Sequence, residues 1–161
     1  MLKRATLLVI LNFALFLPTS ASAFQLGLHM DITWYKDSSL RANSISKAKS
    51  IGAMVSRNSF LWHLIEPTKG VYDWTIYDSV VNELLKARIE PLFCIYGSPS
   101  WANGVPTSTN YHYLYVPTNE THFELWVKNY ETFVKAAVNR YAGRVKKWDG
   151  RPRGKRGART G

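Results

Sequence analysis

The sequence predicts an α/β fold built on a parallel sheet, and three features of the central region support this. An apolar segment ends near Ser56, a second apolar run covers residues 91–96, and a helical pattern lies between them. The helical pattern consists of apolar residues that recur every four positions: Ile76, Val80 and Leu84. A strand–helix–strand segment of this length is a βαβ unit, whose two strands run parallel.

A similar unit precedes this region. Residues 24–29 are predicted to form the first strand. Ser38 or Ser39 is expected to cap a helix that continues through Lys49, and Gly52 supplies the glycine that commonly follows a helix end.

The most strongly patterned helix follows the capping box formed by Thr121 and Glu124 and is expected to end before Gly143. Its apolar residues form one broad stripe, which is typical of core packing: Phe123, Trp126, Val127, Tyr130, Phe133, Val134, Ala137, Val138 and Tyr141. Residues 144–148 are predicted to begin a fourth strand.

The long connection at residues 102–120 carries three tyrosines and is a candidate for a loop that shapes a binding site, because loops of this length are usually functional or disordered. Solvated disorder is the alternative interpretation.

Candidate functional residues cluster where the predicted strands end, which is where parallel α/β folds place their chemistry. A cation, aromatic rings and hydrogen-bonding groups gather there, a combination that suits a sugar. The candidates are Arg57, Asn58 and Trp62 after one strand, Tyr96 and Trp101 after the next, and His29 after the first, where Asp31 also falls. Two alternatives stay open: the two tryptophans pack within loops, and His29 is a structural histidine.

These residues belong to a set of motifs that resembles a known enzyme fold. The motifs are Arg57, then Trp62-x-x-Ile65-Glu66-Pro67-x-x-Gly70-x-Tyr72-Asp73-Trp74, then Gly97-Ser-Pro99-Ser-Trp101-Ala102. Over residues 24–148 the sequence resembles the first half of a clan A glycoside hydrolase. It is most similar to the β-xylosidase-like family 39, with families 5 and 42 as neighbours.

The resemblance implies part of a (β/α)₈ barrel, about three βα units and the start of a fourth strand, and hydrolysis of glycosidic bonds with retention. It also implies that Glu66 shapes a Glu-Pro turn rather than acting in catalysis, and that Arg57 either binds sugar or orders the barrel interior. Cys94 lies in an apolar strand and is expected to be a packed core thiol.

The sequence departs from the family after Trp148. Family members carry Asn-Glu-Pro at the end of the fourth strand, where the Glu is the acid/base, and a nucleophilic Glu after the seventh strand. Neither occurs here, so no catalytic residue is assigned. A full barrel also needs about 250 residues. The chain is therefore expected to be an inactive, aggregation-prone fragment of a secreted glycoside hydrolase; the alternative is a non-catalytic carbohydrate-binding protein.

Both ends differ in composition from the rest. Residues 1–23 read as a secretory signal peptide, with a basic start, an apolar run and the cleavage site Ala21-Ser22-Ala23, whereas a membrane anchor would need a longer run. Residues 149–161 read as a disordered basic tail, a product of a frameshift or truncation, with a nucleic-acid-binding arm as the alternative. Without these basic ends, residues 24–149 hold 14 basic and 11 acidic residues, so the charge of +10 falls to +3.

The expected partner is therefore an oligosaccharide or polysaccharide, outside the cell or in the periplasm. No nucleic acid, no membrane after signal removal, no metal and no cofactor are expected, because no phosphate loop, metal cluster or nucleophile–base pair stands out. The oligomeric state, the sugar and its linkage do not follow from the sequence.

Overall fold

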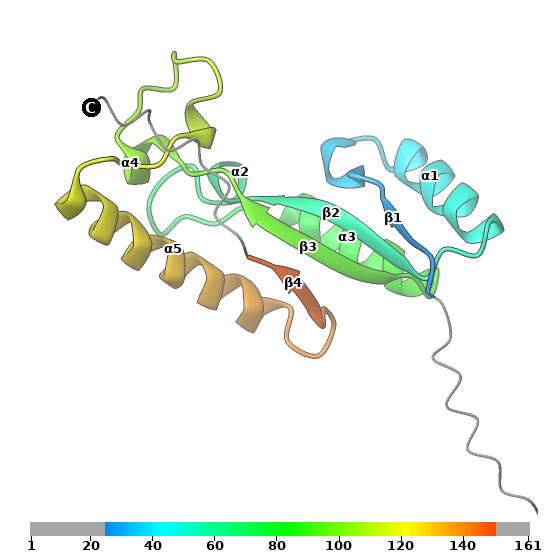
Figure 1. The fold of residues 1–161 in the computed structure, drawn as a ribbon. Coiled ribbons are helices and arrows are strands. Elements are labelled where there is room, and N and C mark those ends of the chain that lie inside the picture. The colour runs from blue at the N-terminus through cyan, green and yellow to red at the C-terminus, as the bar shows by residue number, and fades with distance from the viewer. Residues whose placement is uncertain (1–24, 151–161) are drawn as a thin grey trace, which may run out of the picture.

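The protein was analysed as a computed structural model, which describes residues 25–150. The predicted signal peptide and the basic residues of the predicted tail lie outside this range. Four parallel strands form one sheet in the order β1-β2-β3-β4 (Figure 1). Their bounds are Gly27–His29, Val55–Leu61, Glu90–Tyr96 and Lys147–Asp149. The predicted parallel α/β fold is therefore confirmed.

Helices connect the strands and cover one side of the sheet. α3 (Thr75–Lys86) lies behind the sheet, α5 (Glu120–Arg140) runs beside β3 and β4, and α1 (Ser38–Ser50) lies near β1 (Figure 1). The short elements are η1 (Ile32–Trp34), α2 (Trp62–Ile65), α4 (Ser100–Asn103) and η2 (His112–Leu114). None of the helices within residues 25–150 combines the length and apolar character needed to cross a bilayer.

The helix starts differ from the prediction in which residue caps them. Asp37, not Ser38 or Ser39, is the N-cap of α1, and its carboxylate accepts a bond from the Ser39 amide at 2.8 Å. Asn119, not Thr121, caps α5 by accepting from the His122 amide at 3.3 Å. Several residues near each start have suitable side chains, and the backbone path selects the one with extended φ and ψ.

β2 is longer than the sequence indicated. The prediction ended this strand near Ser56 because Arg57 and Asn58 are polar, but the strand continues to Leu61. Both polar residues are inside the ladder, with Arg57 opposite Leu92 and Asn58 opposite Phe93. β4 likewise includes Asp149, which the prediction assigned to the tail and which pairs with Cys94.

The strand pleat divides the sheet into two unlike faces. The first, called here the helix face, carries the aromatic core that packs against α3 and α5: Phe60, Phe93 and Trp148 from the strands with Tyr77, Phe133 and Tyr141 from the helical side. The second, called the pocket face, carries alternating neighbours of these residues: Arg57, Ser59, Cys94, Tyr96, Lys147 and Asp149. The helix face is mainly hydrophobic, and the pocket face is mainly polar, with Leu61 and Leu92 among its apolar members.

The connection between α4 and α5 is packed against the carboxyl ends of the strands. The Ser98 amide donates to the Tyr113 carbonyl at 2.8 Å, and the Asn103 side-chain amide donates to the His112 carbonyl at 2.8 Å. The Tyr113 ring also stacks on His63, with centroids 4.3 Å apart. This segment is therefore ordered by specific contacts, and it places Leu114 at the edge of the pocket described below.

Candidate functional site

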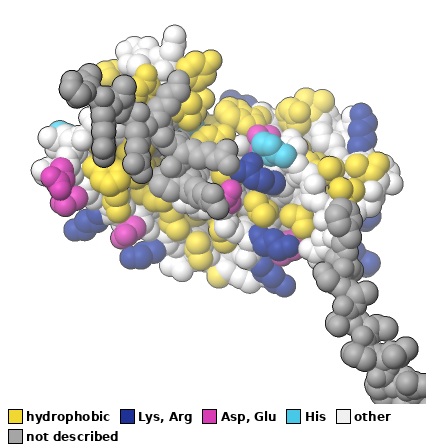
Figure 2. Space-filling view, in the orientation of Figure 1, with side chains coloured by type: hydrophobic (Ala, Val, Ile, Leu, Met, Phe, Trp, Pro, Cys, Tyr) yellow, Lys and Arg dark blue, Asp and Glu magenta, His cyan; other side chains and the backbone are white. Residues whose placement is uncertain are grey.

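A polar pocket of about 240 Å³ lies on the pocket face, where the first three strands end. Its walls come from three strands, the turn after β1 and the α4–α5 connection: His29, Asp31, Arg57, Ser59, Cys94, Tyr96 and Leu114. Figure 2 shows basic, acidic and histidine side chains gathered near the middle of this view, where the helices do not cover the sheet. The pocket can therefore hold a small polar ligand or one ring of a longer one.

Asp31 organises the first wall of the pocket. It adopts the left-handed conformation (φ 47°, ψ 37°), which lets the chain turn sharply from β1 into η1. Its Oδ1 accepts from the Ser59 amide at 2.6 Å and from the Ser59 hydroxyl at 2.7 Å. These two bonds fix the turn after β1 to the middle of β2.

Asn58 holds the same turn from the helix face. Its Oδ1 accepts from the Ile32 amide at 3.0 Å, and its Nδ2 donates to the Ser56 hydroxyl at 2.8 Å. Because the side chain is fully buried and its partners lie within the protein, Asn58 is not brought to the pocket. It supports the turn that places Asp31 there.

His29 and Arg57 meet at the open side of the pocket. The His29 Nε2 lies 2.9 Å from Asp31 Oδ2 and 3.4 Å from the Arg57 guanidinium. A single ring nitrogen cannot donate to the carboxylate and also accept from Arg57, and the shorter contact indicates that Nε2 carries the proton. The Arg57 donors then face the pocket and Asp149.

Arg57 also links β2 to β4. Its Nη2 lies 3.4 Å from Asp149 Oδ2, and the Cys94 thiol donates to the same oxygen at 3.7 Å. Arg57 thus stands between two carboxylates, Asp31 on one side and Asp149 on the other. One cation thus faces two carboxylates, so the pocket walls offer both hydrogen-bond donors and acceptors and carry an excess of negative charge.

Tyr96 closes the wall formed by β3. Its hydroxyl lies 3.0 Å from the Ser59 hydroxyl. Burial raises the pKa of the Tyr96 phenol, the Ser59 hydrogen bond opposes that shift, and the nearby Asp31 carboxylate adds to it. Tyr96 is therefore neutral at physiological pH and offers a hydroxyl and a ring edge to a ligand.

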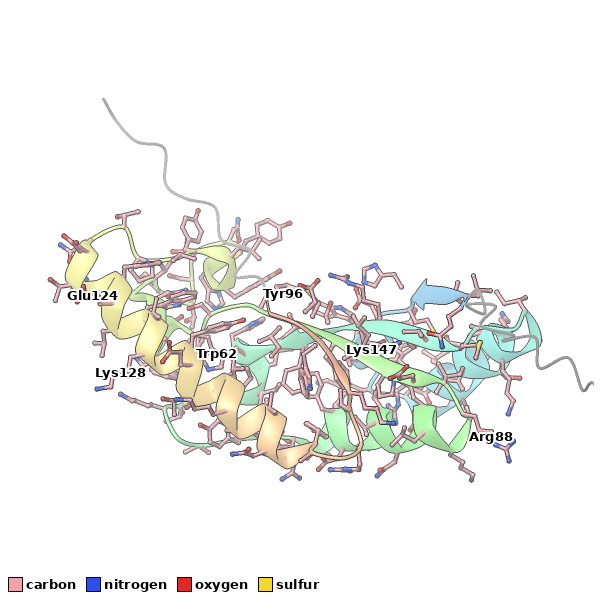
Figure 3. All side chains as sticks on the ribbon, turned by 60° about the horizontal axis from the view of Figure 1, so that its bottom comes forward. Trp62, Arg88, Tyr96, Glu124, Lys128 and Lys147 are labelled. Atoms are coloured by element: carbon pink, nitrogen blue, oxygen red, sulfur yellow. The ribbon has the colours of Figure 1, made fainter. Side chains whose placement is uncertain are left out.

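The structure thus brings together three of the six predicted site residues: His29, Arg57 and Tyr96. The two tryptophans lie elsewhere. Trp62 is 1% exposed, and its ring stacks on Phe133 at 5.5 Å. Figure 3 shows Trp62 beside α5 and Tyr96 at the end of β3.

Glu66 explains why both tryptophans pack within the loops. Its Oε2 accepts from the Trp62 indole at 2.6 Å, and its Oε1 accepts from the Gly70 amide at 2.7 Å. The Glu66 carbonyl accepts from the Trp101 indole at 2.9 Å. The Glu-Pro turn therefore holds the Trp62 and Trp101 side chains in place by hydrogen bonds, in agreement with the structural role expected for Glu66.

Sequence reasoning did not list four residues that line or border the pocket: Ser59, Cys94, Leu114 and Asp149. Alternation along the strands could have found two of them, because Ser59 is two residues after Arg57 and Cys94 is two before Tyr96. Asp149 was assigned to the tail and so lay outside any predicted strand. Leu114 comes from a long loop, and no sequence signal places it. Within residues 25–150, no cluster of three or more His, Cys, Asp or Glu side chains could hold a metal ion.

Comparison with known proteins links this geometry to glycoside hydrolases. The sequence matches the model of a glycoside hydrolase family 42, described as beta-galactosidase, over residues 33–102. That segment includes Arg57, Glu66 and Trp101. A search of curated proteins found no match.

Solved structures with a similar fold come from several bacteria. A β-galactosidase from the psychrophilic Marinomonas ef1 has a TM-score of 0.55 at 17% identity, with 78% of this chain and 21% of that chain covered. A family 39 glycoside hydrolase from the gut symbiont Bacteroides cellulosilyticus WH2 has a TM-score of 0.51 at 20% identity, with 77% and 23% covered. A psychrophilic β-glucosidase from Micrococcus antarcticus has a TM-score of 0.51 at 18% identity, with 66% and 21% covered.

At these identities the structural likeness establishes the fold, which is that of part of a (β/α)₈ barrel. The chain spans between a fifth and a quarter of the length of these three structures. The family match and the shared fold agree with the motifs in the sequence: this chain resembles part of a clan A glycoside hydrolase.

Proposed function

We propose that the pocket on the sheet is part of the carbohydrate site of a retaining glycoside hydrolase, and that this chain binds oligosaccharides or polysaccharides without cleaving them. The observation that carries the proposal is the pocket at the carboxyl ends of β1–β3, with its alternating donors and acceptors. A neutral sugar suits such walls because each hydroxyl both donates and accepts.

The roles of the residues follow from their contacts. Arg57 donates to ring or hydroxyl oxygens, Asp31 accepts from hydroxyls, and Tyr96 supplies a neutral hydroxyl. His29, whose side chain is 56% exposed, lies at the entrance. Trp62 supports this site from the protein interior, whereas Trp101 is half-buried, donates to the Glu66 carbonyl and lies outside the pocket lining.

Hydrolysis with retention needs two carboxyl groups about 5 Å apart, one protonated and one free to attack. Asp31 already accepts two bonds from Ser59, and Asp149 interacts with Arg57 and Cys94. Both carboxylates are held by donors of the protein itself, which disfavours a free attacking carboxylate but leaves further acceptor sites for sugar hydroxyls. This favours the second candidate function, a non-catalytic carbohydrate-binding protein, for the chain as it stands.

The test is titration of the full chain with xylo-, galacto- and gluco-oligosaccharides by isothermal calorimetry or protein NMR. We expect weak saturable binding to one of them. Arg57→Ala should weaken it at least about tenfold, because a donor inside the pocket is lost. Arg88→Ala is the matched control, since Arg88 is exposed and lies at the opposite end of the sheet from Tyr96 (Figure 3). Absence of saturable binding would refute the proposal.

Turnover is tested separately with aryl glycosides of the same sugars, by release of the phenol. We expect no release above the blank. Release that disappears in Asp149→Asn would show that the chain is catalytic and that Asp149 takes part.

We further propose that the protein is exported, on the strength of its signal-like amino-terminal sequence. Expression in a bacterial host followed by amino-terminal sequencing should yield exported protein that begins at Phe24. If the protein is found only in the cytoplasmic fraction and still carries residues 1–23, export is contradicted.

A further inference from the structure

We propose a second saccharide-contact surface on the outer side of the turn that follows β1. It is a hollow of about 350 Å³, separate from the polar pocket and sharing no lining residue with it. Its lining comes from η1, α2 and the start of α3: Thr33, Trp34, Lys36, Leu64, Asp73, Ile76 and Tyr77. The inference rests on the proposed function, because it takes the ligand to be a saccharide.

The hollow presents apolar side chains that the fold does not cover. Trp34 is 50% exposed and Leu64 is 51% exposed. None of the hydrogen bonds found among residues 25–150 uses the Trp34 indole N–H. A large ring with an available donor, set in a concavity beside the exposed Leu64, is able to stack on a ligand and to hydrogen-bond it.

The base of the hollow is rigid. Tyr77 is buried, and its hydroxyl accepts the Leu61 amide at 3.0 Å. The Thr33 hydroxyl donates to the Ser59 carbonyl at 3.1 Å, and the Trp34 amide donates to the Asp31 carbonyl at 3.2 Å. Trp34 is therefore held on the same short turn whose Asp31 lines the polar pocket, so the two surfaces are fixed relative to each other.

The chemistry of the hollow favours a neutral, hydroxylated ligand. Lys36 and Asp73 have opposite charges, and they border an apolar surface made by Trp34, Leu64 and Ile76. A sugar ring has an apolar C–H face that stacks on indole, and its edges carry hydroxyls that suit an ammonium and a carboxylate. A polyanion would meet one charge of each sign and gain no net attraction, and a lipid surface would leave both charged groups desolvated.

A surface of this kind would retain a polymer rather than select a single sugar. Because η1 carries Asp31 into the pocket and Trp34 into the hollow, a long polysaccharide held at the hollow raises the local concentration of chain near the pocket. The expected ligand class is therefore an insoluble or high-molecular-weight polysaccharide, with short oligosaccharides bound mainly at the pocket.

The test is depletion of the full chain from solution by insoluble xylan, galactan and β-glucan, at about 0.3 M salt to suppress charge-driven adsorption. Trp34→Ala should weaken adsorption to the preferred polymer about tenfold, as expected for loss of an aromatic anchor. Tyr111→Ala is the matched control, because Tyr111 is 68% exposed and lies outside the hollow. Thermal melts of both variants check folding, and Trp34→Phe should restore part of the adsorption.

Arg57→Ala separates this inference from the proposed function. Adsorption lost in Trp34→Ala, with binding of short oligosaccharides unchanged, supports the second surface. Adsorption unchanged in Trp34→Ala but lost in Arg57→Ala overturns it and leaves the pocket as the carbohydrate site. No adsorption of the wild-type chain to any of the polymers overturns the second surface, while the proposed function is decided separately by the oligosaccharide titration. Trp34-dependent sedimentation with phosphatidylcholine vesicles in place of polysaccharide overturns the saccharide assignment.

Discussion

Ser59 and Phe60 are neighbours in β2, but they lie on opposite faces of the sheet and in opposite environments. Phe60 is fully buried on the helix face, and its ring lies between 4.6 and 6.2 Å from six other aromatic rings. Ser59, on the pocket face, has hydrogen bonds to Asp31 and Tyr96. One residue contributes by removing apolar surface from water, and the other by placing polar groups.

The same contrast repeats along the sheet. Phe93 and Cys94 in β3, and Trp148 and Asp149 in β4, alternate in the same way. Stability is therefore concentrated on the helix face, where burial is worth about 25 cal/mol per Å². Substitutions on the pocket face should change binding more than stability.

The largest effect is expected for Phe60→Ala. It removes the ring at the centre of the aromatic cluster and leaves a cavity, which should lower the free energy of unfolding by about 4 kcal/mol. Urea denaturation followed by circular dichroism measures this. Phe123→Ala is the control, because Phe123 is 43% exposed, and it should cost less than about 1 kcal/mol. Equal losses in both variants would show that the helix face is not the principal source of stability.

The next largest effect on stability is expected at Glu66, whose hydrogen bonds hold the two tryptophans. Glu66→Ala leaves the buried Trp62 indole and the more exposed Gly70 amide without their acceptors, and the buried unpaired donor accounts for most of a loss of about 2 kcal/mol. Glu66→Gln keeps one acceptor oxygen and should fall between wild type and Glu66→Ala. The exposed Glu124→Ala is the control. A Glu66→Ala variant as stable as Glu124→Ala would show that the hydrogen bonds of Glu66 do not stabilise the fold.

A smaller, pH-dependent effect is expected at His63, whose ring stacks on Tyr113 and whose Nδ1 has no hydrogen-bond partner within the described residues. Burial, and to a lesser extent the charge of His112, lowers the pKa of His63 from 6.5 to about 4. The unfolded chain therefore binds a proton more readily than the folded one. The contribution of neutral His63 is fully present above pH 6.5 and is lost as the pH falls from 6.5 towards 4.

Between pH 7 and pH 5.5 this loss should amount to about 1 kcal/mol. It is measured as the difference between wild type and His63→Phe, which keeps a ring against Tyr113 but does not titrate. Groups that do not interact with His63 titrate equally in both proteins, so their effects cancel. Parallel stability curves for the two proteins would contradict the lowered pKa.

The smallest effect on stability is expected for Ser59→Ala. The Asp31 carboxylate keeps the Ser59 amide as a donor, so the loss should be about 0.5 kcal/mol. Oligosaccharide affinity should nevertheless fall several-fold, because Asp31 and Tyr96 lose the hydroxyl that positions them. Calorimetric titration measures this against Ser44→Ala, a serine on α1 whose hydroxyl bonds only its own helix. Unchanged affinity in Ser59→Ala would show that this hydroxyl does not order the pocket.

Sequence patterns predicted the regular elements well where a single face of the element is buried. The stripe from Phe123 to Tyr141 predicted α5, and the four-residue spacing of Ile76, Val80 and Leu84 predicted α3, because helix packing imposes that period. The strand of residues 91–96 was recognised by its apolar run and is one residue longer in the structure. These elements are determined by local periodicity.

The candidate site was predicted less completely. His29 and Tyr96 were proposed as strand-end residues and do end β1 and β3, whereas Arg57 was proposed on the same ground but lies inside β2; the structure gathers all three in one pocket. Asn58 was grouped with Arg57 by adjacency, but neighbours in a strand point to opposite faces. Trp62 and Trp101 were assigned to the site by their position in the chain. In the structure both indoles instead donate hydrogen bonds to Glu66.

By itself, the sequence determined the parallel α/β fold and the resemblance to a glycoside hydrolase, because both are recorded in local periodicity and in linear motifs. Only the tertiary structure decided which polar residues share the pocket. That choice depends on strand register and on side-chain direction, which alternates with every residue and changes completely with a one-residue shift. The pairing of Asp31 with Ser59, 28 positions apart, and of Arg57 with Asp149, 92 positions apart, exists only once the strands lie side by side.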